Sequence, residues 1–341
     1  MIPSDQATPS LPYNRDGDGD DIVLDYLYAY ACHESEVELC SLELHCLFPG
    51  VRPDPDLRAF RHSRRLDPSR SPFIKQRLSI RLDTASEEEL MEAAADVLTS
   101  GEGTFRSRYV KIGASNEPGN EQRLALERRL GLSVTGEPDL KRPDMVFGLT
   151  RFQGRWFAGE LIESEPVWLR HKDKPRQYST ALPTRAARAA VNIAAPQSTE
   201  ARLIDPCCGI GTVLLEALSM GMDIRGSDLN PLAVTGARVN LEHFGYSPEL
   251  AVIADMRTLE GRFDAAILDM PYNLCSVSPP EEQLEMLQSL LRLSGRAVIV
   301  TSESIESIIE EAGFQIEATA RLTKGNFVRF FHLCVGKPLQ L

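Results

Sequence analysis

A short apolar run near residue 203 leads into a turn that contains two glycines. The turn reads Asp205-Pro206-Cys207-Cys208-Gly209-Ile210-Gly211-Thr212, and an apolar helical pattern follows it. Gly209 and Gly211 can adopt a positive φ and let a ligand lie against bare backbone. A helix that begins at Thr212 would present free N–H groups to a carboxylate or a phosphate. The pattern therefore predicts a strand, a ligand-binding turn and a helix.

Three more apolar runs each end in an acidic residue, at Asp228, Asp255 and Asp269. Ligands bind at the carboxyl ends of the strands in open α/β sheets, so we expect these acids to meet at one edge. Asp228, 23 residues after Asp205, can hold the two hydroxyls of a ribose. Asp255 is placed to accept a hydrogen bond from an adenine amino group. The predicted cofactor site therefore contains Asp205, Cys208, Gly209, Gly211, Thr212, Asp228, Leu229, Asp255, Met256 and Asp269.

A glycine turn alone occurs in nicotinamide, flavin and S-adenosylmethionine folds. Together with the acids that follow, residues 203–335 resemble a class I S-adenosylmethionine-dependent methyltransferase, which implies a Rossmann-like seven-stranded sheet. Asp269-Met270-Pro271-Tyr272 resembles the (Asp/Asn)-Pro-Pro-(Tyr/Phe) signature of enzymes that methylate exocyclic amino nitrogens. This resemblance implies that Asp269 and the carbonyl of Met270 accept hydrogen bonds from the amine, and that Tyr272 stacks on the base. Met270 departs from the signature, which has proline there and so a fixed φ.

The segment before this region carries a second resemblance. Residues 122–161 read as a helix, then Asp139-Leu140-Lys141-Arg142-Pro143-Asp144, then a hairpin, and they resemble the later part of a THUMP domain, an RNA-binding module of tRNA-modifying enzymes. A basic linker, Leu182-Pro183 and an Ala-Arg helix resemble the corresponding segment of THUMP-bearing guanine N2-methyltransferases. In that family the segment lies along the methionine end of the cofactor, which makes Leu182 and Pro183 candidate lining residues.

Taken together, these segments most resemble the tRNA guanine-10 N2-methyltransferase family. The expected organisation is α/β, with an α+β N-terminal region before the methyltransferase sheet. It comprises a disordered tail (1–20), a ferredoxin-like domain (21–98), a THUMP-like domain (99–165), a basic linker (166–182) and the methyltransferase domain (183–341).

The net charge of −12 weighs against a nucleic-acid substrate until its distribution is considered. Residues 57–82 hold eight basic side chains and one acid, and residues 166–190 hold six and one, whereas residues 200–341 hold 11 basic and 19 acidic side chains. Two basic segments thus lie outside the acidic catalytic half. The candidate RNA-binding residues are Arg64, Arg65, Lys141, Arg142, Arg170, Lys172, Lys174 and Arg176.

Composition limits the remaining classes. The chain of 341 residues has no apolar run long enough for a membrane span and no secretory signal pattern, and it has seven cysteines without a Cys-x-x-Cys pair. We therefore expect a cytoplasmic protein that does not bind membranes, with no metal site and with Cys207 and Cys208 packed beside the cofactor. A tRNA is the expected partner, and relatives in the resembled family add a small activating subunit.

Three alternatives remain open at this point. The same signature would serve a guanosine at another tRNA position or in ribosomal RNA. It would also serve a protein-glutamine or DNA-adenine methyltransferase, which the acidic total favours and the THUMP-like segment does not. A cofactor-binding RNA scaffold with poor turnover is the non-enzymatic alternative, to which Met270 points.

Overall fold

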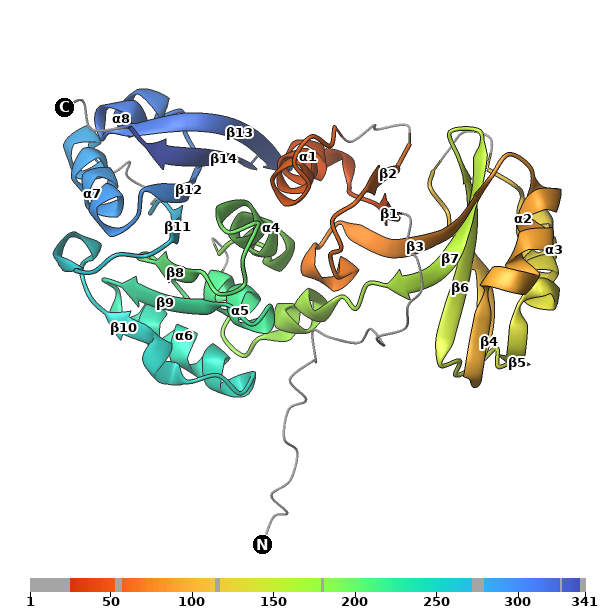
Figure 1. Ribbon diagram of the computed structural model, residues 1–341. Coiled ribbons are helices and arrows are strands. Elements are labelled where there is room, and N and C mark those ends of the chain that lie inside the picture. Colours follow the sequence, from red (N-terminus) through yellow and green to blue (C-terminus); the bar gives the residue numbers. More distant parts are fainter. Residues whose placement is uncertain are drawn as a thin grey trace, which may run out of the picture. The chain divides into compact units, whose positions relative to one another are not determined.

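The computed structural model describes residues 25–52, 57–113, 117–178, 181–271, 279–325 and 327–337 (Figure 1). The chain forms two compact units, and each is described here by itself. The first unit contains the residues up to Ala31 together with Pro53–Glu165. The second unit contains Cys32–Arg52 and the chain from Pro166 onward.

The first unit is built on a seven-stranded sheet in the order β2-β1-β3-β7-β6-β4-β5. Ser86 caps helix α2, because its hydroxyl accepts from the N–H of Glu89 at 3.2 Å. Because β3 pairs with β7, strands from the expected 21–98 and 99–165 segments belong to the same sheet. The elements are β1 (Asp25–Tyr30), β2 (Ala59–His62), β3 (Ile74–Thr84), α2 (Glu87–Val97), β4 (Thr99–Tyr109), α3 (Asn120–Ser133), β5 (Thr135–Pro138), β6 (Met145–Phe152) and β7 (Arg155–Glu163).

The second unit contains the predicted Rossmann-like sheet of seven strands, in the order β10-β9-β8-β11-β12-β14-β13. Strands β8 to β12 pair in parallel, and β14 lies antiparallel between β12 and β13. The resemblance to class I methyltransferases predicted a sheet of this kind, with seven strands. The elements are α4 (Thr184–Ala194), β8 (Arg202–Asp205), α5 (Thr212–Ser219), β9 (Asp223–Asp228), α6 (Pro231–His243), β10 (Ala251–Ile253), β11 (Ala265–Asp269), α7 (Pro280–Leu293), β12 (Arg296–Thr301), α8 (Glu306–Glu311), β13 (Phe314–Lys324) and β14 (Phe327–Gly336).

Helix α1 (Val37–Leu47) belongs to this second unit, although it precedes most of the first unit in the chain. It contacts α4 and β13, and Figure 1 shows it beside α4. The Asn192 amide donates to the buried carboxylate of Glu43 at 2.6 Å, and Arg185 pairs with Glu36 at 3.1 Å. The expected ferredoxin-like domain included this helix, but its buried side chains pack on the methyltransferase unit.

Both faces of the second sheet are covered. Side chains of α7 and α8 form one apolar cluster with the buried Ala266 and Leu268 of β11. Since neighbouring side chains of a strand point to opposite faces, the buried Ala265 and Ile267 mark a second covered face. Among the helices that the structure describes, none is long and apolar enough to cross a membrane.

Candidate active site

The glycine turn follows β8 and leads directly into α5. Gly209 and Gly211 adopt φ values of 53° and 79°, which side chains disfavour, so glycine is required at both. The turn is fixed to the next strand because the N–H of Cys208 donates to the carbonyl of Ser227 at 2.8 Å. The expected strand, turn and helix are therefore present, and helix α5 begins directly after the turn, at Thr212.

Asp228 ends β9 and is bonded to the glycine turn. Its Oδ2 accepts from the N–H of Gly209 at 2.8 Å, and its Oδ1 accepts from the N–H of Asn230 at 2.8 Å. Asn230 in turn caps α6 by accepting from the N–H of Leu232 at 3.0 Å, and Pro231 occupies the first helical position. The Asp228 carboxylate is therefore oriented by backbone donors.

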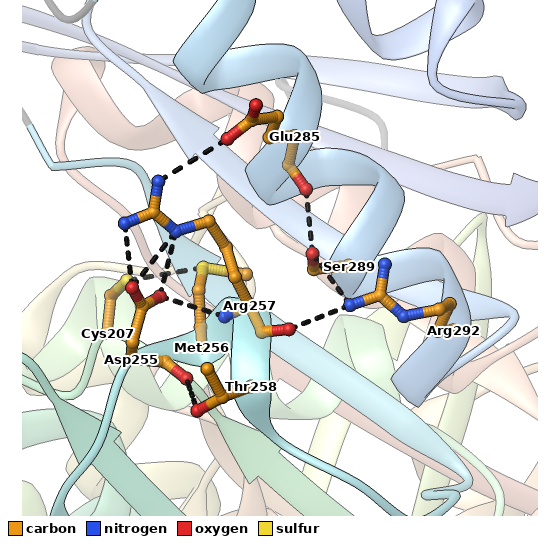
Figure 2. A network of polar contacts seen from close by, with 8 residues as sticks. All are labelled: Cys207, Asp255, Met256, Arg257, Thr258, Glu285, Ser289 and Arg292. Carbon is orange, nitrogen blue, oxygen red and sulfur yellow. Dashed lines mark hydrogen bonds and ion pairs between the residues drawn. The ribbon is translucent and has the colours of Figure 1, made fainter.

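Asp255 is held by the side chain two residues later (Figure 2). Arg257 donates from Nε to both carboxylate oxygens at 3.0 Å and from Nη2 to Oδ2 at 2.7 Å. These hydrogen bonds keep the pKa of Asp255 below its ordinary value. The Arg257 Nη1 reaches Glu285 of α7 at 3.4 Å, and its carbonyl accepts from Arg292 at 2.9 Å. The segment after β10 is thus attached to α7.

Two carboxyl groups at the ends of β8 and β11 are largely withdrawn from water. Burial, followed by the charges of Asp269 and Asp228, raises the pKa of Asp205 well above its ordinary range. Burial also raises the pKa of Asp269 to about 7, against the opposing charge of Arg329. The Arg329 Nη2 lies 3.8 Å from Asp269 Oδ2. Asp269 therefore titrates near neutral pH.

A cavity of about 410 Å³ opens at this edge of the sheet. Ten of the twelve expected cofactor residues line it, and the two that do not are Pro183 and Gly211. The ten are Leu182, Asp205, Cys208, Gly209, Thr212, Asp228, Leu229, Asp255, Met256 and Asp269. The cavity is also lined by residues outside the expected set, among them Tyr178, Ala181, Arg257, Glu282 and Met286. Tyr178 and Ala181 lie in the basic linker, whereas no motif marks the other three.

The residues of this cavity fit an adenosyl amino acid. Thr212 begins α5 and lines the cavity, and its buried Oγ1 has no hydrogen-bond partner among the described residues. A hydroxyl and free N–H groups at a helix N-terminus suit the carboxylate of an amino acid. Asp228 presents acceptors for ribose hydroxyls. Burial raises the pKa of both Cys207 and Cys208, which disfavours the thiolate form that a nucleophile needs.

The candidate catalytic segment leaves β11 at this cavity. Asp269, Met270 and Pro271 line it, whereas Tyr272 lies outside the described residues. Met270 is 6% exposed, and its N–H donates to the carbonyl of Val300 at 2.9 Å. Proline has no N–H to donate. The departure from the signature thus replaces a ring constraint by a hydrogen bond to the neighbouring strand.

The basic linker is partly a structural anchor. Val167–Asp173 forms a 3-10 helix that buries Trp168 and His171. The His171 Nδ1 lies 2.7 Å from Glu216 Oε1, and Arg188 Nη1 lies 3.0 Å from Glu216 Oε2. All three side chains are buried, so this cluster fixes the linker to α5 and α4.

The candidate RNA-binding residues differ in exposure. Arg65, Lys141, Arg142, Arg170, Lys172 and Arg176 are exposed, and Arg64 is half-buried. Lys174 is only 6% exposed, and burial lowers the pKa of its ammonium. Expecting Lys174 to meet RNA was therefore wrong, because the sequence shows its charge but not that it faces the interior beside Glu216.

Comparisons with known proteins show which families and structures this chain resembles. The model of the RMKL-like methyltransferase domain family matches residues 171–325. The "tRNA (guanine(10)-N2)-dimethyltransferase" of Methanothermobacter thermautotrophicus is 27% identical over 248 residues, which are 66% of this chain and 71% of that protein. The "U6 snRNA (guanine-N(2))-methyltransferase THUMPD2" of Mus musculus is 24% identical over 65% of this chain and 43% of its own length. The crystal structure of TrmN from Thermus thermophilus has a TM-score of 0.46 and 22% identity, and the match covers 92% of this chain and 99% of that one.

The matched region contains β8 to β13 and the cavity at their edge. Residues 171–325 are similar to the RMKL-like methyltransferase domain, and the chain is a methyltransferase that takes S-adenosylmethionine as its cofactor.

Proposed function

We propose that this enzyme methylates the exocyclic N2 of a guanosine in tRNA, at position 10. The observation that carries the proposal is that Asp269-Met270-Pro271 lines the same cavity as the glycine turn and Asp228. The name of the archaeal relative, a tRNA guanine(10)-N2-dimethyltransferase, supports this substrate.

The chemistry asks for hydrogen-bond acceptors beside the amine. The lone pair of guanine N2 is delocalised into the ring, so the nitrogen is a poor nucleophile. Acceptors directed at its two protons favour a more tetrahedral nitrogen, and we assign this role to the Asp269 carboxylate and the Met270 carbonyl. S-adenosylmethionine supplies an electrophilic methyl group on a positively charged sulfur. On transfer, the S–CH₃ bonding electrons would stay on sulfur, and Asp269 would accept the proton that the amine loses or pass it to water.

The base must leave its stack to reach this cavity. We assign Tyr272 to stacking on the extruded base and Pro271 to the turn that presents it. We assign Leu182 and Pro183 to the methionine end of the cofactor. Of these two residues, Leu182 lines the cavity. The exposed members of the candidate basic set would contact the RNA backbone with an affinity that falls as salt rises.

We propose that the first unit is the RNA-binding part. It contains the THUMP-like segment (99–165) and the ferredoxin-like segment (21–98) except for Cys32–Arg52, which belong to the second unit. In the THUMP-like segment the backbone N–H groups of Lys141 and Arg142 donate to Asp139 Oδ1 at 2.8 and 3.0 Å. This turn leaves both basic side chains exposed. A cytoplasmic location suits a tRNA substrate. A small activating subunit is the further partner proposed, and activity of the purified chain alone measures whether it is needed.

The test is transfer of labelled methyl groups from S-adenosylmethionine to unmodified tRNA, DNA and protein fractions, followed by mass spectrometry of the nucleosides. The proposal expects label in tRNA as N2-methylguanosine or its dimethyl form, and loss of that product from a transcript with adenosine at position 10. Label in DNA as N6-methyladenine, or in protein glutamine, would overturn it. Tight RNA binding without label would instead indicate a scaffold.

The mouse relative raises a second candidate, a guanosine in a spliceosomal RNA, because its name gives U6 snRNA as the substrate. Including U6 and ribosomal RNA transcripts in the same assay separates the candidates. Faster methylation of either transcript than of tRNA would move the assignment away from tRNA, whereas the catalytic residues would remain the same.

A further inference from the structure

Strand β14 carries a buried arginine to the catalytic edge of the sheet. Because β14 runs antiparallel, its first residues lie at the edge where the parallel strands end. Phe331 of β14 is in register with Val300 of β12, which is in register with Asp269 of β11. Arg329 lies two residues before Phe331 and so points to the same face as Phe331. Its guanidinium can therefore reach the end of β11.

The contact made there is between opposite charges in a poorly solvated place. Arg329 is 6% exposed, and its Nη2 lies 3.8 Å from Asp269 Oδ2. The same guanidinium lies over the ring of Phe327, 5.1 Å from its centroid. Burying a charged arginine costs free energy unless a carboxylate lies beside it. Burying the charged Asp269 carboxylate likewise costs free energy unless a cation lies beside it.

The other charged groups around Asp269 are mostly acidic. Asp205 of β8 and Asp228 of β9 line the same cavity, as does Glu282 of α7. Arg257 also lines it, but this side chain is bound to Asp255. Among the described residues, Arg329 is the cation within ion-pair distance of Asp269. Without it, a carboxylate beside Asp205 would tend to hold its proton.

We propose that Arg329 is a positioning residue, which keeps the Asp269 carboxylate charged and oriented to accept hydrogen bonds from the substrate amine. The inference rests on the proposed function, because it assigns Asp269 the task of accepting those bonds. A protonated Asp269 would present a donor where the amine needs an acceptor.

The first test is the pH profile of kcat for wild type, Arg329→Met and Arg329→Lys. The acidic limb of Arg329→Met should move to higher pH by about one unit, which leaves its kcat about fivefold lower at pH 7 and close to wild type at pH 9. Arg329→Lys should move the limb back toward wild type, and Arg321→Met, an exposed arginine of the same hairpin, should leave it in place. An unshifted limb in Arg329→Met, with wild type active on RNA, would overturn the inference while leaving the proposed function intact.

The second test needs no RNA and therefore stands even if the substrate is different. It is a double-mutant cycle of thermal unfolding with Arg329→Met and Asp269→Asn, measured at pH 5.5 and 8.5. An ion pair predicts that the two substitutions are coupled, more strongly at pH 8.5 than at pH 5.5. Additive effects at both pH values would show that Arg329 does not act on the Asp269 charge.

Discussion

Asp255 and Arg257 form a two-residue clamp in which one guanidinium contacts both oxygens of the carboxylate, with the shortest contact at 2.7 Å. Both residues line the cavity, so the clamp fixes the orientation in which the Asp255 carboxylate can accept further hydrogen bonds. Because Arg257 also reaches Glu285, the clamp attaches the segment after β10 to helix α7 (Figure 2).

Removing this clamp should weaken cofactor binding. Arg257→Ala frees the Asp255 carboxylate to rotate, and we expect about fivefold weaker binding of S-adenosylhomocysteine, as for the loss of one net hydrogen bond. Titration calorimetry measures it. Arg292→Ala is the matched control, because Arg292 joins the same network at the Arg257 carbonyl and does not line the cavity. Equal losses in both variants would mean that the network acts only on the fold.

Asp228 should matter more for the cofactor than for turnover. Asp228→Ala removes the acceptor for Gly209 and Asn230 and the proposed acceptor for ribose. Hydrogen bonds to a charged group predict about 10-fold to 100-fold weaker binding of S-adenosylhomocysteine. Asp228→Asn retains one oxygen and should fall between wild type and Asp228→Ala. A variant that loses kcat but keeps its affinity would show that Asp228 has another role.

The buried cluster around Glu216 should dominate the stability of the second unit. Glu216→Ala leaves Arg188 buried without its carboxylate, and the side chains of this pair are 1% and 0% exposed. Breaking such a pair costs about 3–5 kcal/mol of unfolding free energy. Glu285→Ala, at a half-exposed pair, should cost less than about 1 kcal/mol. Urea denaturation measures both, and a small loss in Glu216→Ala would show that the cluster is solvated or replaced.

Asp269 should make the unliganded protein less stable as pH rises. Its pKa in the folded state is about 7, above the value of an unfolded chain, so its contribution is complete below about pH 4 and is lost as pH rises to 7. The full effect would be about 4 kcal/mol. The difference in unfolding free energy between wild type and Asp269→Asn should therefore fall across this window. A constant difference would place the pKa of Asp269 near its ordinary value.

Sequence patterns predicted much of the second unit because its signals are local. The glycine turn, the helix that follows it and the acids after the apolar strands depend on neighbouring residues, and the structure has each of them. The position of α1 depends on contacts such as Asn192 with Glu43, which are 149 residues apart, and no local pattern reports them.

Charge patterns predicted less. The charge of Lys174 marks it as a candidate for RNA binding, but the structure shows its side chain buried, with its ammonium directed to the His171 carbonyl at 3.5 Å. The contact of Arg329 with Asp269 follows from the antiparallel position of β14 beside β12, which no local sequence pattern shows. Arg329 and Asp269 meet because β14 lies next to β12 in the sheet, and assigning each segment as a strand does not reveal this order.

The most direct test of the account is the amount of N2-methylguanosine formed in unmodified tRNA by wild type and Asp269→Asn, at saturating S-adenosylmethionine and measured by mass spectrometry. The account predicts product with wild type and a loss of about 10²-fold to 10³-fold in Asp269→Asn, with binding of S-adenosylhomocysteine retained. Equal product from both proteins would contradict the role given to Asp269, and methylation confined to another atom or another class of molecule would contradict the proposed reaction.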